Sequence, residues 1–71
     1  MMQDGRIARV TEVIAGSPNG FDDAIKLCFE RANKTLRGIT GMKVTELRVN
    51  CEGGKIVEYR ARAEVIFLLE D

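Results

Sequence analysis

The chain has 71 residues, of which 45% are hydrophobic and 31% charged, and its 11 basic and 11 acidic residues give a net charge of zero. This length predicts a single domain spanning residues 1–71, and the balanced charge predicts neither a nucleic-acid nor a membrane partner. The longest apolar run is far below the ~20 residues of a membrane helix. The opening MMQDGRIARV has no signal-peptide core, so we expect a cytoplasmic protein with reduced cysteines.

The absence of histidine excludes several kinds of chemistry. Imidazole general-base catalysis, Ser-His and Cys-His couples, and His-containing zinc sites are all excluded. Two cysteines in separate elements cannot complete a four-thiolate metal site within one chain. The composition therefore predicts a protein that is neither an enzyme nor a metalloprotein. A domain this small buries only ~60% of its unfolded surface, so we also expect it to be stabilised by homo-oligomerisation.

The first half of the chain predicts a strand followed by a helix. β-Branched residues favour a strand over residues 6–14, and residues 15–20 form a turn rich in Gly, Ser, Pro and Asn. Residues 21–37 predict a helix that ends near Gly38, a residue suited to the left-handed conformation. Leu27 lies off its apolar stripe and is expected to face solvent or a neighbouring subunit. The stripe itself consists of Phe21, Ile25, Cys28, Phe29, Ala32 and Leu36.

The second half predicts two strands, over residues 42–51 and 55–70, joined by a Glu-Gly-Gly hairpin loop. In the last strand apolar and charged residues alternate, so one face is apolar and the other is charged. The order of elements predicts the α+β fold class, with a β-α-β-β protomer. Its three-stranded antiparallel sheet carries one helix packed on one face, and the other face stays uncovered and available for assembly.

The charged face of the sheet predicts the strand register. A three-residue loop pairs Arg48 with Glu58 and Glu46 with Arg60, whereas a slip of two residues sets Arg48 against Arg60, a destabilising like-charge pair. The face is either a solvated surface or an ion-pair face between protomers that also binds anions, and both interpretations stay open. Its charged residues are Glu46, Arg48, Glu58, Arg60, Arg62 and Glu64.

Other motifs are interpreted as structural. Residues 16–20 join a strand to a helix, as a phosphate-binding loop does, but they lack the GK[ST] ending, and Asp22 and Asp23 follow, so a plain capped loop is favoured. Residues 38–41 match the GxxG clamp of KH domains, yet a strand rather than a helix follows them. No acidic cluster matches a calcium loop. Cys28 is predicted to be a small core residue.

The order and spacing of several segments resemble the dodecins, a family of small flavin-binding proteins with β-α-β-β protomers. The resemblance covers residues 7–70 and implies a hollow homododecameric shell with helices outward and sheets inward. It also implies flavin rings held in pairs between subunits, for storage or sequestration rather than catalysis. The segments are Gly16-Ser17, FDDAIKLCFERANKTLR at 21–37, MKVTE at 42–46, GKIVEYR at 54–60 and EVIFLLE at 64–70.

Two positions differ from flavin-binding dodecins and become the candidate ligand-binding residues. The Trp that stacks on the flavin, immediately before the second strand, is replaced by Gly41, and the Gln that follows the third-strand tyrosine, here Tyr59, is replaced by Arg60. Loss of a stacking surface costs ~1–3 kcal/mol per ring. We therefore expect binding of FMN or riboflavin to be weakened or lost. Arg60 favours a different planar or phosphorylated ligand, and the alternative is a structural or ion- or anion-binding assembly that binds no flavin.

Overall fold

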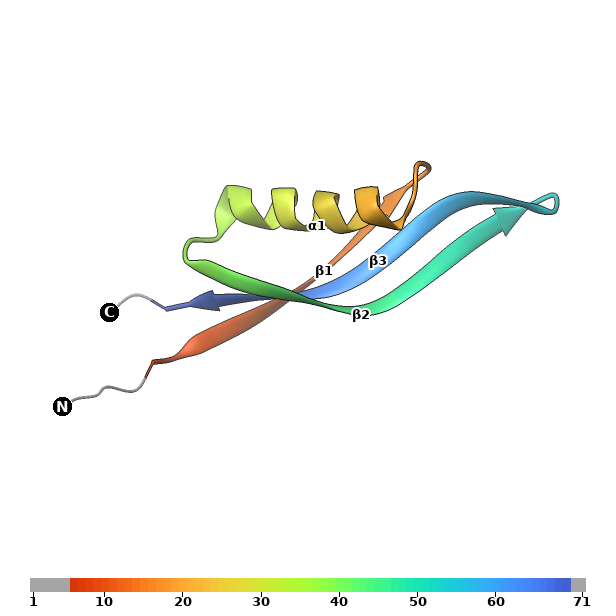
Figure 1. Ribbon diagram of the computed structural model, residues 1–71. Helices are drawn as coiled ribbons and strands as arrows, with labels where there is room; N and C mark the ends of the chain where they lie inside the picture. The colour runs from red at the N-terminus through yellow and green to blue at the C-terminus, as the bar shows by residue number, and fades with distance from the viewer. Residues whose placement is uncertain (1–5, 70–71) are drawn as a thin grey trace.

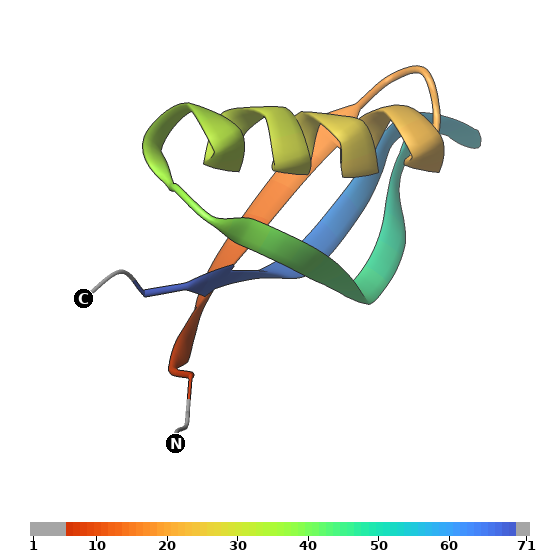
Figure 2. The same cartoon turned by 60° about the vertical axis from the view of Figure 1, so that its left-hand side comes forward.

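The computed structural model describes residues 6–69. In chain order the elements are β1 (Ala8–Ser17), α1 (Phe21–Thr35), β2 (Ile39–Glu52) and β3 (Lys55–Leu68). The strands form one antiparallel sheet of order β1-β3-β2, with α1 lying along one of its faces (Figure 1). The other face is uncovered (Figure 2). The predicted α+β class and the β-α-β-β order are confirmed.

Strand pairing makes both edge strands longer than predicted. β1 continues to Ser17, which pairs with Tyr59 of β3. β2 begins at Ile39, which pairs with Phe67. β3 therefore supplies hydrogen-bonding partners for residues that local composition assigns to turns, because a long central strand extends the ladder on both of its sides. The helix correspondingly ends at Thr35, two residues earlier than predicted.

Side chains fix the turn between β1 and α1. Ser17 Oγ donates a hydrogen bond to the Asp23 carboxylate at 2.5 Å, and the backbone N–H of Asn19 donates to Ser17 Oγ at 3.0 Å. The side-chain cap predicted for this loop is not found, because Gly20 occupies the N-cap position and has no side chain with which to cap the helix. Beyond the other end of α1, Gly38 has φ 72°, the left-handed conformation predicted for it.

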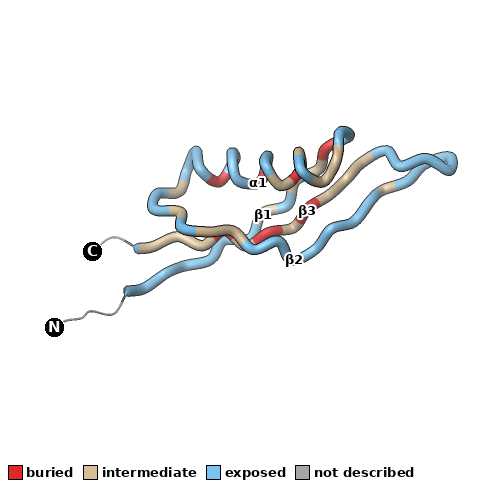
Figure 3. The backbone as a smooth tube through the Cα atoms, viewed as in Figure 1, coloured by how far each residue is buried: buried red, intermediate tan, exposed pale blue. Residues whose placement is uncertain are grey.

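The hydrophobic core lies between α1 and β3 and is small (Figure 3). Phe29, predicted to belong to the buried stripe, is 42% exposed, whereas Ala24 is fully buried. The helix packs mainly against β3 and β1 and has little contact with β2. Leu27 is exposed, as predicted. The buried apolar residues are Ala24, Cys28, Ala32, Ala61, Ala63 and Val65.

The turn between β2 and β3 contains two residues rather than three. Gly53 and Gly54 have φ values of 57° and 76° and connect Glu52 to Lys55, which pair directly. Two left-handed residues make the hairpin turn whose twist matches that of the flanking strands, and glycine adopts this conformation without steric cost. The turn, together with a bulge after Asn50, sets the register of the whole hairpin.

The predicted β2–β3 register is therefore wrong by two residues. Arg48 faces Arg60 and Glu46 faces Arg62, so the expected pairs Arg48–Glu58 and Glu46–Arg60 do not form across the ladder. Exposed charge pairs contribute less than about 1 kcal/mol, so turn geometry and apolar packing outweigh them. The like-charge pair that electrostatics alone would reject is part of the fold.

Candidate functional site

The sheet face opposite α1, called the open face below, carries the predicted charged residues. Ala61 and Ala63 are buried against α1, and residues that alternate with them along β3 point to the other side of the sheet. The cross-strand partners of these residues lie on the same side. The common face predicted for the set is confirmed, while its role in assembly stays a prediction. The set is Glu46, Arg48, Glu58, Arg60, Arg62 and Glu64.

Arg62 forms the centre of an ion-paired cluster on the open face. Its Nη1 lies 3.1 Å from Glu12 Oε1, and its Nε lies 3.5 Å from Glu46 Oε1. The three side chains are 40–51% exposed, so each pair contributes at most about 1 kcal/mol. Because Glu12 is on β1 and Glu46 is on β2, the Arg62 cluster links all three strands and carries one excess negative charge.

A second cluster, formed by Arg48, Asn50, Glu58 and Arg60, lies toward the hairpin and carries one excess positive charge. Glu58 Oε1 accepts hydrogen bonds from Arg60 Nε at 3.0 Å and from Asn50 Nδ2 at 2.7 Å. Arg48 Nη2 donates to Asn50 Oδ1 at 3.4 Å. Among the described residues Arg48 has no carboxylate partner within ion-pair distance. This cluster is called the Arg48–Arg60 cluster below.

Gly16 makes room for the Glu58 carboxylate. Gly16 pairs with Arg60 across the β1–β3 ladder, and a Cβ at this position would collide with the carboxylate of Glu58. Sequence reasoning missed the contributions of Gly16 and Asn50. Because residues 15–20 were assigned to a turn, Gly16 was not recognised as a glycine inside a strand, a feature that often marks the close approach of another group.

The two candidate ligand-binding residues share the open face but are far apart within one chain. Gly41 lies inside β2, not before it as predicted, and pairs with Ile66. Arg60 is six residues further along β3 from that partner, a separation of about 20 Å at about 3.4 Å per residue. A side chain at Gly41 would have space, since the nearest atom to a Cβ there is Ile66 Cδ1 at 3.9 Å.

Tyr59 and Cys28 face the helix side of the sheet and take no part in the open face. The Tyr59 ring packs edge-on against Phe21, with centroids 5.2 Å apart and planes at 80°. Cys28 is buried, its Sγ lies 3.7 Å from the carbonyl oxygen of Ala61, and burial raises the pKa of its thiol. The core role predicted for Cys28 is confirmed.

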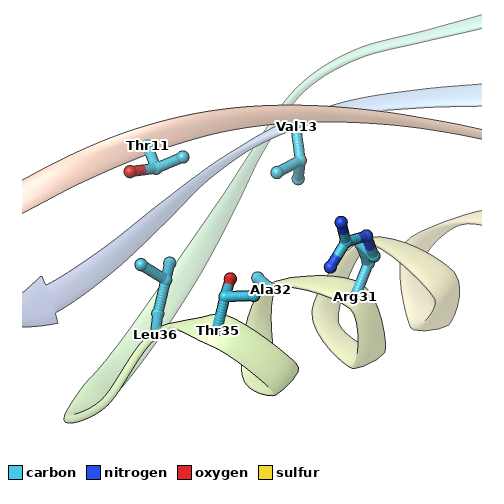
Figure 4. A pocket seen from close by; sticks show the side chains of 6 residues that line it. All are labelled: Thr11, Val13, Arg31, Ala32, Thr35 and Leu36. Carbon is cyan, nitrogen blue, oxygen red and sulfur yellow. The ribbon is translucent and has the colours of Figure 1, made fainter.

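A groove between α1 and β1 lies on the helix side of the sheet (Figure 4). It is lined by Thr11, Val13, Arg31, Ala32, Thr35 and Leu36. Because it is separated from Gly41 and Arg60 by the sheet itself, it is not part of the candidate site.

Within residues 6–69 no group of three or more acidic or cysteine side chains is close enough to hold a metal ion. In the same part of the chain, no helix has the length and apolar character needed to span a bilayer.

The fold and the open face together define a small α+β protomer with a sheet covered by one helix on one side only. The chain belongs to the dodecin family, whose family model matches residues 7–70. A dodecin from Thermus thermophilus is 33% identical over 67 residues, which cover 94% of this chain and 97% of the relative. A solved variant of the Thermus dodecin replaces a tryptophan with phenylalanine, whereas this chain contains no tryptophan.

Solved structures of other dodecins have the same fold. The dodecin from Streptomyces coelicolor superposes with a TM-score of 0.90 at 33% identity, covering 97% of this chain and 99% of that chain. A calcium-chelating dodecin from Mycobacterium tuberculosis, described as having a novel calcium-binding site, gives a TM-score of 0.78 at 28% identity and covers 90% and 91% of the two chains.

Proposed function

We propose that this chain is a single dodecin-like domain that assembles into a non-catalytic homododecameric shell and holds a small ligand. The observation that carries the assembly is the size of the core, in which Val65 is the largest fully buried side chain. Such a core gives little stability to an isolated domain. The free thiols of Cys28 and Cys51 fit a reducing compartment such as the cytoplasm.

Exposed apolar side chains on the β2–β3 hairpin support self-association. The hairpin extends beyond the end of α1 (Figure 1), so its large apolar residues have no covering element within the chain. Leu47 and Ile56 are each about half exposed, and Val49 and Val57 are 37% and 41% exposed. Exposed large apolar side chains that lie near one another in a hairpin are typical of an interface between protein chains.

A ligand that contacts both Gly41 and Arg60 would lie between two copies of the chain, because one chain holds these residues about 20 Å apart. This separation supports a ligand site between subunits. Gly41 offers no surface to an isoalloxazine ring, and the lost stacking corresponds to a roughly 5–150-fold weaker affinity for flavin. We therefore propose that riboflavin and FMN bind more weakly here than in dodecins that carry the stacking tryptophan.

The alternative is a structural or ion-binding shell that binds no flavin. The Arg62 cluster favours it, because the guanidinium of Arg62 already pairs with Glu12 and Glu46 and links the three strands. The calcium-chelating relative from Mycobacterium tuberculosis favours ion binding by a shell of this kind. Ion ligands in this chain would then be contributed by more than one subunit.

Native mass spectrometry after mild purification tests the assembly and detects any retained ligand. We expect twelve subunits at micromolar concentration, and a monomer or dimer at neutral pH would contradict the proposal.

Flavin titration tests the role of Gly41. Gly41→Trp should bind riboflavin more tightly than the unmodified chain and quench its fluorescence, whereas Gly41→Leu, which fills the same position with a side chain that has no aromatic ring, should not. Tight flavin binding by the unmodified chain would contradict the predicted weakening.

A further inference from the structure

We propose that Arg48 and Arg60 form an anion-binding site on the open face that takes a phosphate group. This inference rests on the proposed ligand-holding function and names the chemical group that the ligand presents. The site needs the arginines at positions 48 and 60 of this chain.

The hairpin places Arg48 and Arg60 directly opposite each other on neighbouring strands. The Gly53-Gly54 turn and the bulge after Asn50 together fix the register in which Arg48 and Arg60 are direct cross-strand partners. The Cβ atoms of such partners are about 4.5–5.5 Å apart, and like charges on directly opposite residues destabilise a sheet. An anion between the two arginines would convert this repulsion into two attractive contacts. The charge of Arg62, on the same face, is already balanced by two carboxylates, so Arg62 requires no bound anion.

The neighbouring side chains hold both arginines while leaving donors free for a ligand. The hydrogen bond from Arg60 to Glu58 uses Nε, and the one from Arg48 to Asn50 uses Nη2. A guanidinium has five N–H donors, so each arginine keeps further donors for an anion. Gly16 contributes by leaving the space that the Glu58 carboxylate occupies. The Arg60 side chain is 43% exposed, so a ligand can reach it from solvent.

Phosphate fits this site better than a single carboxylate does. A phosphate monoester carries a charge of about −1.5 to −2 at pH 7 and has three strong acceptor oxygens. Two guanidinium groups can therefore each make charge-assisted, bidentate contacts to it. The excess positive charge of the Arg48–Arg60 cluster attracts a phosphate, while the excess negative charge of the Arg62 cluster disfavours its binding further along the face.

Calorimetric titration with inorganic phosphate tests the site, using the full chain at constant ionic strength in a chloride buffer. We expect saturable binding that Arg48→Gln and Arg60→Gln each weaken about tenfold or more, the effect of losing hydrogen bonds to a charged group. Arg31→Gln removes the same charge from the helix side of the sheet and should leave the affinity unchanged. Arg60→Lys keeps the charge but loses the bidentate geometry and should give an intermediate affinity.

A parallel titration with FMN and riboflavin identifies the source of the phosphate. Tighter binding of FMN than of riboflavin, lost in Arg60→Gln, supports a ligand-borne phosphate, whereas equal binding of the two together with saturable inorganic phosphate supports the free ion. The proposal is overturned if the unmodified chain shows no saturable phosphate binding, or if Arg31→Gln weakens binding as much as Arg60→Gln does. A subunit count on the same samples separates the two proposals. If an intact dodecamer does not bind phosphate, the phosphate site is rejected and the shell is retained. If a smaller species binds phosphate and the binding depends on the two arginines, the shell is rejected and the phosphate site is retained.

Discussion

Replacement of Arg48 by glutamate tests the strand register through the sign of its effect on stability. In the structure Arg48 faces Arg60, so Arg48→Glu converts a like-charge pair into an opposite-charge pair and should stabilise the fold. In the register expected from electrostatics alone, Arg48 would face Glu58. The same substitution would then create a like-charge pair and should destabilise the fold.

The size of the effect follows from the exposure of the pair. Removing a like-charge cross-strand pair and adding an opposite-charge pair each change stability by roughly 0.2–1 kcal/mol. The Arg60 side chain is 43% exposed, so screening by water puts each step in the lower part of that range. We expect Arg48→Glu to raise the free energy of unfolding by about 0.5–1 kcal/mol and Arg48→Gln by about half as much. The corresponding rise in melting temperature is a few degrees.

The assay is thermal or urea unfolding at one fixed protein concentration, because the stability of an oligomer depends on concentration. The buffer should be free of phosphate and low in salt, and the series should be repeated in about 1 M sodium chloride, where the Debye length is about 3 Å. Adding Arg60→Glu to Arg48→Glu restores a like-charge pair and should cancel the gain. Lower stability of Arg48→Glu, with Arg48→Gln between it and the unmodified chain, would refute the register.

Three further predictions follow from local geometry. Gly53→Ala should destabilise the hairpin by about 1–2 kcal/mol in urea unfolding, because φ is 57° and nothing within 4 Å of the new Cβ can compensate, and Gly53→Asn should cost less. Burial raises the pKa of the Cys28 thiol above 9.0, so the native state keeps a proton that the unfolded chain releases. The free energy of unfolding should fall as pH rises above about 9, and Cys28→Ala should remove this component of the pH dependence; an unchanged profile would contradict it. Gly16→Ala should displace the Glu58 carboxylate and weaken phosphate binding, and an unchanged affinity would show that Glu58 does not orient Arg60.

The sequence by itself determined the elements and the faces of this protein. The helical spacing around Cys28 and the strict alternation along residues 55–70 are local patterns, and each predicts which side chains face the core, although Phe29 in the helix is 42% exposed. Segment order and spacing were sufficient to indicate the family. The missing tryptophan at Gly41 and the arginine at position 60 were also visible without a structure.

The tertiary structure decided how those faces are assembled. The register was missed because a two-glycine turn with both residues left-handed, together with the bulge after Asn50, outweighs weakly coupled surface charges, and sequence reasoning gave the charges priority. The approach of the Glu58 carboxylate to Gly16 joins residues 42 positions apart in sequence, so no local pattern encodes it. The same is true of the distance between Gly41 and Arg60 on one face, because it is set by the pairing of β2 with β3.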